Sequence, residues 1–368
     1  MNIKLYDIGR ADSVLLSDHN KNLLIDCGVK KDDISNSMDI NNDLSYSDNH
    51  LLITHYHDDH IRGLDHIYGD VFDTVYMSRF PLCLFNVSSK TELKKFIKLY
   101  AYTPSKTKIN IYLKNILRLY NSLSKVVKAN GTIQMLNKGD KFSHVREFTV
   151  IHPDISCETL APKELIAYAD KYIKIMEATM DKTAVKKFNQ YANQYAKAVN
   201  ELALPDETTN FKFNEVISKE LIRSLDKVLY NVNQVKKGIS EYQDFDSINK
   251  SFGKYMNNNS LVIHNEDILF TGDVTRSTIA SLHSNEEFME SYKVIKLPFH
   301  GSNAHYSMNL PYADFLLSCS DSIIWDINED SQYLNLLLKS MTIFSNGDVF
   351  HNGHIYHKFY DGQIKINL

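Results

Sequence analysis

Metal-binding side chains are concentrated in one short segment of this sequence, HYHDDH at residues 55–60. The segment follows the apolar run LLIT, which predicts a buried strand. In an extended chain His55 and His57 point to the same side, because strand side chains alternate with a period of two. If a helix begins directly afterwards, Asp59 and His60 project from its first turn. Two imidazoles then face one metal ion, and a carboxylate with an imidazole faces another, a donor set that suits zinc, manganese or iron.

A solvated polar loop with chance histidines is the alternative interpretation of this segment. The whole chain has only 15 histidines in 368 residues, so three within six positions favour a metal site. Three further strand ends share one local pattern, an apolar run followed by a ligand-type residue beside a glycine that permits a sharp turn. They are Asp26 in LLIDCG, Asp273 in ILFTGD and His300 in KLPFHGS. Each alone fits an ordinary turn, but together with the histidines they predict one site.

The elements that would position these residues alternate between strand and helix. Short strand patterns fill the first third of the chain and return at 148–154 and after residue 258. Apolar residues at spacings of three and four predict helices in 90–130, ending at a glycine, and in 158–250. We therefore expect an α/β fold, a single domain over 1–368 with two helical insertions. The second insertion would form a lid or a homodimer contact.

Composition excludes several other classes of protein. The formal net charge is −4, and the four cysteines are widely spaced without a CxxC pair, which disfavours a disulfide framework and a thiolate zinc site. No window approaches eighteen consecutive apolar residues, and the N-terminus does not read as a signal peptide. These features predict a cytoplasmic protein that does not enter a membrane.

The motifs together resemble a known superfamily. HYHDDH fits the HxHxDH motif of the metallo-β-lactamase fold, and Asp26, Asp273 and His300 fall where that superfamily has further motifs. More closely, the chain resembles the hydrolase domain of ComEC-type DNA-uptake proteins and its free-standing relatives. The stretches that carry this resemblance are DIGRADSVLL, LLIDCG, LLITHYHDDHIRGL, FTVIHP, NNNSLVI, ILFTGD and KLPFHGS. The resemblance implies an αββα four-layer sandwich in which the segments between these stretches are insertions.

The resemblance also implies roles for individual residues. The ligands that it assigns to two divalent metal ions, Zn²⁺ first with Mn²⁺ or Fe²⁺ as alternatives, are His55 and His57 for one ion, Asp59, His60 and His300 for the other, and Asp273 as the bridge. Asp26 would orient a ligand imidazole through its second ring nitrogen. A hydroxide held between the ions would attack the substrate, with Asp59 and Asp273 as catalytic carboxylates.

The sequence departs from the family pattern at several positions. The third ligand of the first ion, usually a histidine, has two candidates here, His152 in VIHPD and the run Asn257–Asn259. Phe299 precedes His300 where ComEC-like chains often have a second histidine, so His300 would bind alone. The side chains predicted as possible substrate contacts are Arg62, which could equally be a surface residue, together with Asn258, Ser302 and His305.

The segment 90–147 is strongly basic for a chain of net negative charge. It holds thirteen Lys and Arg against three Asp and Glu, with four tyrosines interleaved between residues 100 and 120. Cationic and aromatic side chains in one segment suit a phosphate backbone with stacked bases. The alternative is a lysine-rich solvated helix face that is packed by its tyrosines.

These observations predict a metal-dependent hydrolase, and phosphodiesters are its expected substrates. The fold and metal motif do not choose between phosphodiesters and carbonyl substrates, but the ComEC-like motifs and the basic segment favour a nuclease or nucleotide phosphodiesterase. A thioester or lactone hydrolase is the first alternative, and absence of phosphodiesterase activity would favour it. A non-catalytic module that binds nucleic acid or protein is the second, and full nucleic-acid affinity without metal would favour that.

Overall fold

The computed structural model describes most of two stretches of the chain and short pieces elsewhere. The described residues are 1–6, 8, 11–29, 37–45, 48–78, 98, 108–154, 170, 173–174, 177–178, 182–183, 185–186, 189–190, 208–210, 257–302, 305, 307–318, 342–345, 350–351, 354–355 and 366–367. The chain divides into two compact units. The first unit comprises Met1–Ser78, Val126–Asp154 and Met256–Leu368, and the second comprises Arg79–Lys125 and Ile155–Tyr255.

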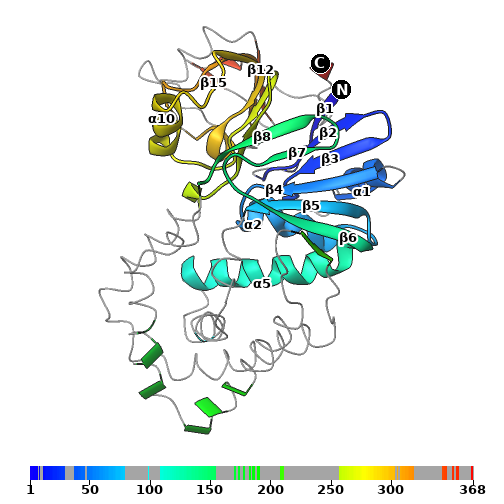
Figure 1. Ribbon diagram of the computed structural model, residues 1–368, viewed down its shortest axis with the longest axis vertical. Helices are drawn as coiled ribbons and strands as arrows, with labels where there is room; N and C mark the ends of the chain where they lie inside the picture. Colours follow the sequence, from blue (N-terminus) through cyan, green and yellow to red (C-terminus); the bar gives the residue numbers. More distant parts are fainter. Residues whose placement is uncertain are drawn as a thin grey trace. The chain divides into compact units, whose positions relative to one another are not determined.

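One mixed sheet of the first unit is formed largely by the N-terminal third of the chain (Figure 1). Within this unit its strand order is β17-β1-β2-β3-β4-β5-β6. The strands from β17 to β3 pair antiparallel, and those from β3 to β6 pair parallel. The strand bounds are β1 Asn2–Leu5, β2 Val14–Asp18, β3 Lys21–Ile25, β4 Asp48–Ile53, β5 Phe72–Ser78, β6 Val127–Leu136 and β17 Ile366–Asn367.

A second mixed sheet has the order β14-β13-β12-β11-β10-β8-β7. Strands β11 to β14 pair parallel, and β7, β8, β10 and β11 pair antiparallel. Its bounds are β7 Lys141–Ser143, β8 Glu147–His152, β10 Val262–His264, β11 Ile268–Phe270, β12 Ser291–Lys296, β13 Tyr312–Ser318 and β14 Thr342–Ser345. Short pieces complete the described strands: β9 Thr208–Asn210, and the pair β15 Phe350–His351 and β16 His354–Ile355.

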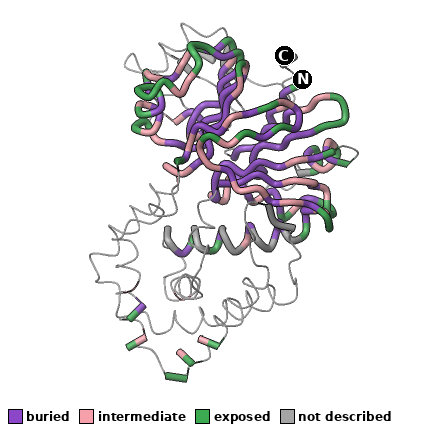
Figure 2. The backbone as a smooth tube through the Cα atoms, in the orientation of Figure 1, coloured by how far each residue is buried: buried purple, intermediate pink, exposed green. Residues whose placement is uncertain are grey.

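The two sheets share one apolar core. A single cluster of buried residues draws Leu16, Leu23 and Leu52 from the first sheet and Phe148 and Phe270 from the second. Figure 2 shows buried residues along most of the strands of both sheets. Interlocked apolar side chains from two facing sheets hold the strand ends at fixed positions, which is the requirement for a site built from several strand ends.

Helices lie outside this core. The helices of the described residues are α1 Ser37–Leu44, α2 Asp58–Ile61, α5 Lys108–Val126 and α10 Arg276–Ser284, with 3-10 turns η1 Arg62–His66 and η3 Pro298–Gly301. In α10, Ile279 and Leu282 pack in a second apolar cluster with β-strand residues such as Val262 and Ile295. Side-chain amides attach α1 to the first sheet, since Asn49 donates to the carbonyl of Leu44 over 2.7 Å. The predicted α/β class is confirmed, whereas the four-layer sandwich stays a prediction.

The helix predicted to run to Gly131 ends several residues earlier. Helix α5 ends at Val126, and the next residues form β6, so Gly131 lies inside a strand and does not end a helix. A register shift between Phe72 and Thr74 of β5 accommodates the extra β6 residues before Thr132 pairs with Thr74. Tertiary pairing with β5 therefore decides the conformation of a segment whose local pattern favours helix.

The predicted insertions fall mainly on the second unit. The segment 90–130 is described as helix only at residue 98 and in α5, and most of 158–250 lies outside the described residues, so the single-domain prediction and the lid or dimer contact stay predictions. Among the described residues, none of the helices is both long enough and apolar enough to span a membrane.

Candidate metal centre

The histidine segment enters the site from the end of β4. Residues 54–57 continue from the strand as an extended loop, and α2 begins at Asp58, as the sequence predicts. A second loop, after β3, packs directly against α2. The amide of Cys27 donates to the carbonyl of His60 over 2.7 Å, and a Cβ added to Gly28 would lie 1.8 Å from the carbonyl oxygen of Asp59. Only glycine permits this approach of the two backbones.

Asp26 connects β3 to both the histidine loop and α2. Its carboxylate accepts hydrogen bonds from the backbone amide and the hydroxyl of Thr54, each over 2.7 Å. Oδ2 also accepts a hydrogen bond from Nδ1 of His60 over 2.8 Å. Because Nδ1 donates to Asp26, Nε2 is the ring nitrogen of His60 that faces the interior of the cluster. Asp26 therefore fixes the orientation of the His60 imidazole, and its role beside a metal ligand stays a prediction.

Asp273 is central to the cluster. It follows β11 and Gly272, whose φ of 51° belongs to the left-handed region that favours glycine. Its Oδ2 lies 3.5 Å from Nε2 of His55 and 3.4 Å from Nε2 of His60. His55 and His57 also meet, with Nε2 of the first 2.9 Å from Nδ1 of the second. Asp273 is fully buried between imidazoles that come from the other sheet.

His300 joins the cluster from the turn after β12. The residue has a φ of 54°, so this turn holds a non-glycine residue in a sparsely populated conformation. Its Nε2 lies 3.0 Å from Oδ2 of Asp59, and its Nδ1 lies 3.0 Å from Oδ1 of Asp12. His300 thus reaches α2 on one side and a second carboxylate on the other.

A buried lysine completes the charge arrangement. Lys296, the last residue of β12, forms an ion pair with Asp12 and donates to the carbonyl of Gly272 over 3.2 Å. Its ammonium also lies 3.7 Å from Oδ1 of Asp273. A cation that is only 3% exposed needs such anionic partners, because burial of an uncompensated charge is costly.

The cluster polarises its carboxylates and imidazoles. Burial alone would raise the pKa of Asp273, but His60, His55 and His300 hold it well below its usual range. Burial would lower the pKa of His60, yet Asp273, Asp26 and Asp12 hold it well above the ordinary value. Burial would likewise lower the pKa of His300, but Asp12, Asp273 and Asp59 raise it to about 9.

The other two imidazoles are neutral. Burial lowers the pKa of His55 well below its ordinary value and that of His57 to about 4. Neutral imidazoles and ionised carboxylates are the forms that bind metal ions, and the protons on His60 and His300 supply positive charge in the absence of an ion.

Three overlapping groups in this cluster have the composition of metal sites. Within each group the potential ligand atoms lie within 4.8 Å of one another. The first group is His55, His57 and Asp273, the second is Asp59, His60 and His300, and the third is Asp12, His60 and Asp273. Among the described residues, Nε2 of His60 and both carboxylate oxygens of Asp273 are buried without a hydrogen-bond partner. Buried polar atoms are normally satisfied, so this donor set fits a cation.

One family comparison bears on this site. Residues 10–89 match the family described as Anti-Pycsar protein Apyc1. The match covers about a fifth of the chain and includes Asp12, Asp26 and the HYHDDH segment. It does not include Asp273, Lys296 or His300. Comparisons with curated proteins and with solved structures gave no match.

His152, one candidate for a further ligand, belongs to none of these groups. Nε2 of His152 lies 2.5 Å from the backbone carbonyl oxygen of Asn258, to which it donates, and burial lowers the pKa of His152. The side-chain oxygens of Asn257 and Asn258 are buried and, among the described residues, accept no hydrogen bond. Both alternatives for this ligand therefore stay predictions.

Three of the predicted substrate contacts, Arg62, Ser302 and His305, have partners within the protein. Arg62 forms an ion pair with Asp58 one turn earlier in the chain, which favours the structural interpretation of this residue. Nδ1 of His305 lies 3.0 Å from the carbonyl oxygen of Val274, and its ring stacks on Phe299 with centroids 4.2 Å apart. The amide of Ser302 donates to the carbonyl of Phe299 over 2.9 Å and so belongs to the turn that holds His300.

Two site residues were missed in the sequence. Asp12 lies in DIGRADSVLL, a stretch that carries the family resemblance, but it follows no strand-glycine pattern of the kind used to select Asp26. Lys296 is the single charged residue in VIKLPF, an apolar stretch directly before His300. A lone cation in a buried strand was the available signal, because such a residue needs a buried anion.

Proposed function

We propose that this protein is a metal-dependent phosphodiesterase with the metallo-β-lactamase fold, holding two divalent ions in the cluster around Asp273. The observation that carries the proposal is the convergence of Asp273 with His55 and His60, whose Nε2 atoms lie 3.5 and 3.4 Å from the same carboxylate oxygen. One carboxylate that faces ligands of two groups suits a pair of ions better than a single ion. Zn²⁺ is the first choice for an imidazole and carboxylate donor set, and Mn²⁺ or Fe²⁺ also fit.

The ligand sets follow from the groups in the cluster. His55, His57 and Asp273 would hold one ion, and Asp59, His60 and His300 with Asp273 would hold the other. When bound, the ions lower the pKa of water, so that a nucleophile forms at neutral pH, and they stabilise negative charge on the attacked group.

The other residues of the site prepare these ligands. Asp26 holds the proton of His60 on Nδ1, and Asp12 faces the corresponding atom of His300 at 3.0 Å. Both imidazoles then offer Nε2 to the cluster. Lys296 offsets part of the carboxylate charge, which would otherwise repel an anionic substrate. We assign Asp26, Asp12 and Lys296 as positioning residues.

Phosphodiesters are preferred over carbonyl substrates because the motifs of the site resemble those of ComEC-type hydrolase domains. The ComEC-like motifs cover the strand ends that form the site. The family matched by residues 10–89 is described as an anti-Pycsar protein. As a separate part of the proposal, we infer that this chain also acts against Pycsar. The basic segment 90–147 supports a nucleic-acid substrate less strongly. In the described part of this segment, ion pairs engage Lys98, Lys128, Lys138, Lys141 and Arg146.

The first test is hydrolysis of bis(p-nitrophenyl) phosphate by protein reconstituted with Zn²⁺ or Mn²⁺. We expect turnover that depends on metal and is lost in Asp59→Ala. Asp58→Ala is the matched control, because this neighbouring aspartate pairs with Arg62 and belongs to none of the ligand groups of the described residues. Equal loss in both variants would mean that Asp59 has no special role, and full activity in Asp59→Ala would refute the assignment.

The same metal-reconstituted protein is then tested on natural classes of substrate. Single-stranded DNA, RNA and cyclic nucleotides would be compared by turnover per ion. Hydrolysis of thioesters or lactones without phosphodiester cleavage would transfer the proposal to carbonyl chemistry. Nucleic-acid affinity that is unchanged by metal removal, with no turnover of any substrate, would support a binding module instead.

A further inference from the structure

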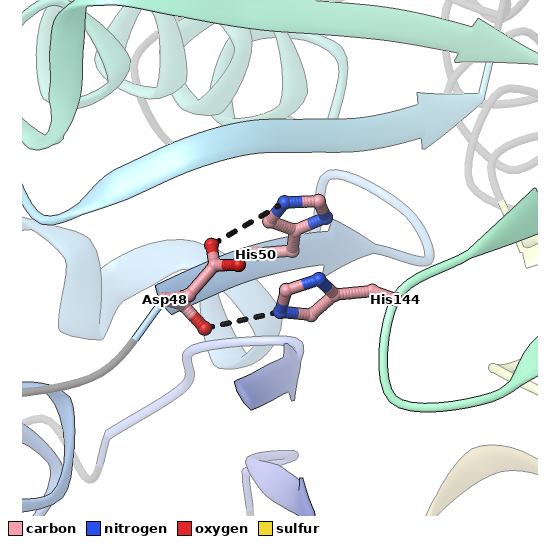
Figure 3. Close-up of side chains that lie close together, drawn as sticks. All are labelled: Asp48, His50 and His144. Atoms are coloured by element: carbon pink, nitrogen blue, oxygen red, sulfur yellow. Dashed lines mark hydrogen bonds and ion pairs between the residues drawn. The ribbon is translucent and has the colours of Figure 1, made fainter. Parts of the chain in front are cut away.

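A second cluster of metal-binding side chains lies at the other end of β4 (Figure 3). Asp48 and His50 stand at the start of this strand, and His144 lies in the turn between β7 and β8 of the other sheet. The potential ligand atoms of the three residues lie within 4.8 Å of one another. His55 follows His50 by five steps of mostly extended chain, roughly 16 Å at about 3.3 Å per step, so this cluster is distinct from the centre around Asp273.

Each imidazole has one ring nitrogen engaged by an oxygen. Nδ1 of His50 lies 3.1 Å from the hydroxyl oxygen of Tyr76, and Nε2 of His144 lies 3.0 Å from the backbone carbonyl oxygen of Asp48. The carbonyl can only accept, so Nε2 of His144 carries the proton and Nδ1 carries the lone pair. Metal-binding histidines typically donate their other N–H to an oxygen in this way.

Two atoms of the cluster are placed to share an ion. Nε2 of His50 lies 3.8 Å from Oδ1 of Asp48, a span that an ion can bridge, since zinc ligands lie about 2.0–2.2 Å from the metal. His144 is buried and His50 is half-buried, whereas Asp48 is exposed and keeps an entry path for an ion. We propose that Asp48, His50 and His144 form a binding site for a divalent transition-metal ion, with Zn²⁺ as the preferred occupant.

The geometry of the imidazoles makes a further demand on this site. The rings of His50 and His144 are stacked, with centroids 3.5 Å apart and an interplanar angle of 10°. In-plane lone pairs of two parallel rings do not converge on one point, so an ion must tilt one ring out of the stack. Three protein ligands also leave a fourth position, which water would fill.

The position of the site gives it a structural consequence. Asp48 and His50 belong to the first sheet, and His144 belongs to the turn that closes the edge of the second sheet. An ion held by all three would join the two sheets at the start of β4, the end of that strand opposite to the histidine loop. Because such a site exists only in the folded chain, the ion would raise the melting temperature.

The test measures the number of bound ions and the melting temperature of the full chain after the main centre has been disabled by a substitution. Asp273→Ala removes the shared ligand of that centre, and the same background then receives Asp48→Asn, His144→Ala or the control His19→Ala. His19 is an exposed histidine 3.1 Å from Asp18, so it matches the type of pair without belonging to the cluster. Apo protein is titrated with Co²⁺, whose visible absorption reports the ligands, and with Zn²⁺ in thermal melts.

We expect one ion per chain in the Asp273→Ala background, a cobalt spectrum with imidazole ligands, and a zinc-dependent rise in melting temperature. Affinity should fall at least tenfold in Asp48→Asn and His144→Ala and stay unchanged in His19→Ala. Asp48→Asn alters an exposed side chain, so it keeps the test valid if His144→Ala does not fold. Equal cobalt affinity in Asp48→Asn and His19→Ala would overturn the proposal, whatever the activity of the main centre.

Discussion

Asp26 and His60 are joined by a 2.8 Å hydrogen bond between Oδ2 and Nδ1, although Asp26 follows β3 and His60 lies in α2. The same carboxylate accepts two hydrogen bonds from Thr54, which leads into the histidine loop. One buried side chain therefore sets both the path of the loop and the tautomer of an imidazole that faces Asp273.

Asp26→Asn should weaken metal binding while the fold persists. An amide is uncharged and can present its NH₂ group to His60, so the imidazole loses the partner that fixes its tautomer. Loss of such a partner typically costs 10–100-fold in metal affinity. Competition with a chromogenic chelator measures the zinc affinity. Asp65→Asn, an exposed position in η1, is the control, and equal affinity in the two variants would contradict the role of Asp26.

Gly28→Ala should destabilise the protein severely. The added Cβ would lie 1.8 Å from the carbonyl oxygen of Asp59, and this atom belongs to backbone that cannot move without shifting α2. We expect a loss of at least about 3 kcal/mol in the free energy of unfolding, or insoluble protein. Gly69→Ala is the control, because a Cβ added at Gly69 would have no neighbour within 4 Å. Its cost is only the strain of the positive φ, about 1–2 kcal/mol. Denaturant titrations that show equal losses would disprove the close approach.

Metal binding should release protons and strengthen as the pH rises toward 9. In the metal-free protein, burial would lower the pKa of His300, but Asp12, Asp273 and Asp59 raise it to about 9. The pKa of His60 is likewise held well above its ordinary value, so His60 is also protonated. Both imidazoles must lose a proton to bind a metal. Each proton changes the zinc affinity by up to about tenfold per pH unit below its pKa. Calorimetry in buffers of different ionisation enthalpy counts the protons, and zero release at pH 7 would contradict this charge state.

Stability of the metal-free protein should fall as the pH drops below about 6.5. Burial lowers the pKa of His264, whose Nδ1 lies 2.8 Å from the Tyr292 hydroxyl. The unfolded chain binds a proton near pH 6.5, while the folded chain binds it only at lower pH, so the contribution is present above 6.5 and is lost through the folded pKa. His264→Leu should reduce the pH slope of the unfolding free energy, whereas exposed His283→Leu should leave it unchanged.

The ligand types and their order in the chain could be predicted from the sequence. HYHDDH after an apolar run implies a strand that delivers imidazoles, because strand alternation and the start of a helix are local properties. The glycine turn before Asp273 follows from backbone sterics, which are local as well, because Gly272 has a φ of 51°. Gly28 is instead required by its close approach to the backbone of Asp59, which is a tertiary contact. Strand assignments next to these residues were confirmed for β3, β4, β11 and β12.

Tertiary structure decided which distant residues meet. Asp12 and His300 are 288 positions apart and contact each other only because both sheets share one core. The same packing buries Lys296 against Asp12, brings His144 onto His50, and draws residues 127–130 from an expected helix into β6. It also pairs cations in the described part of the basic segment with carboxylates, such as Lys138 with Glu287. Local periodicity carries no information on such contacts, since they depend on the burial of two sheet faces against each other rather than on neighbours in the chain.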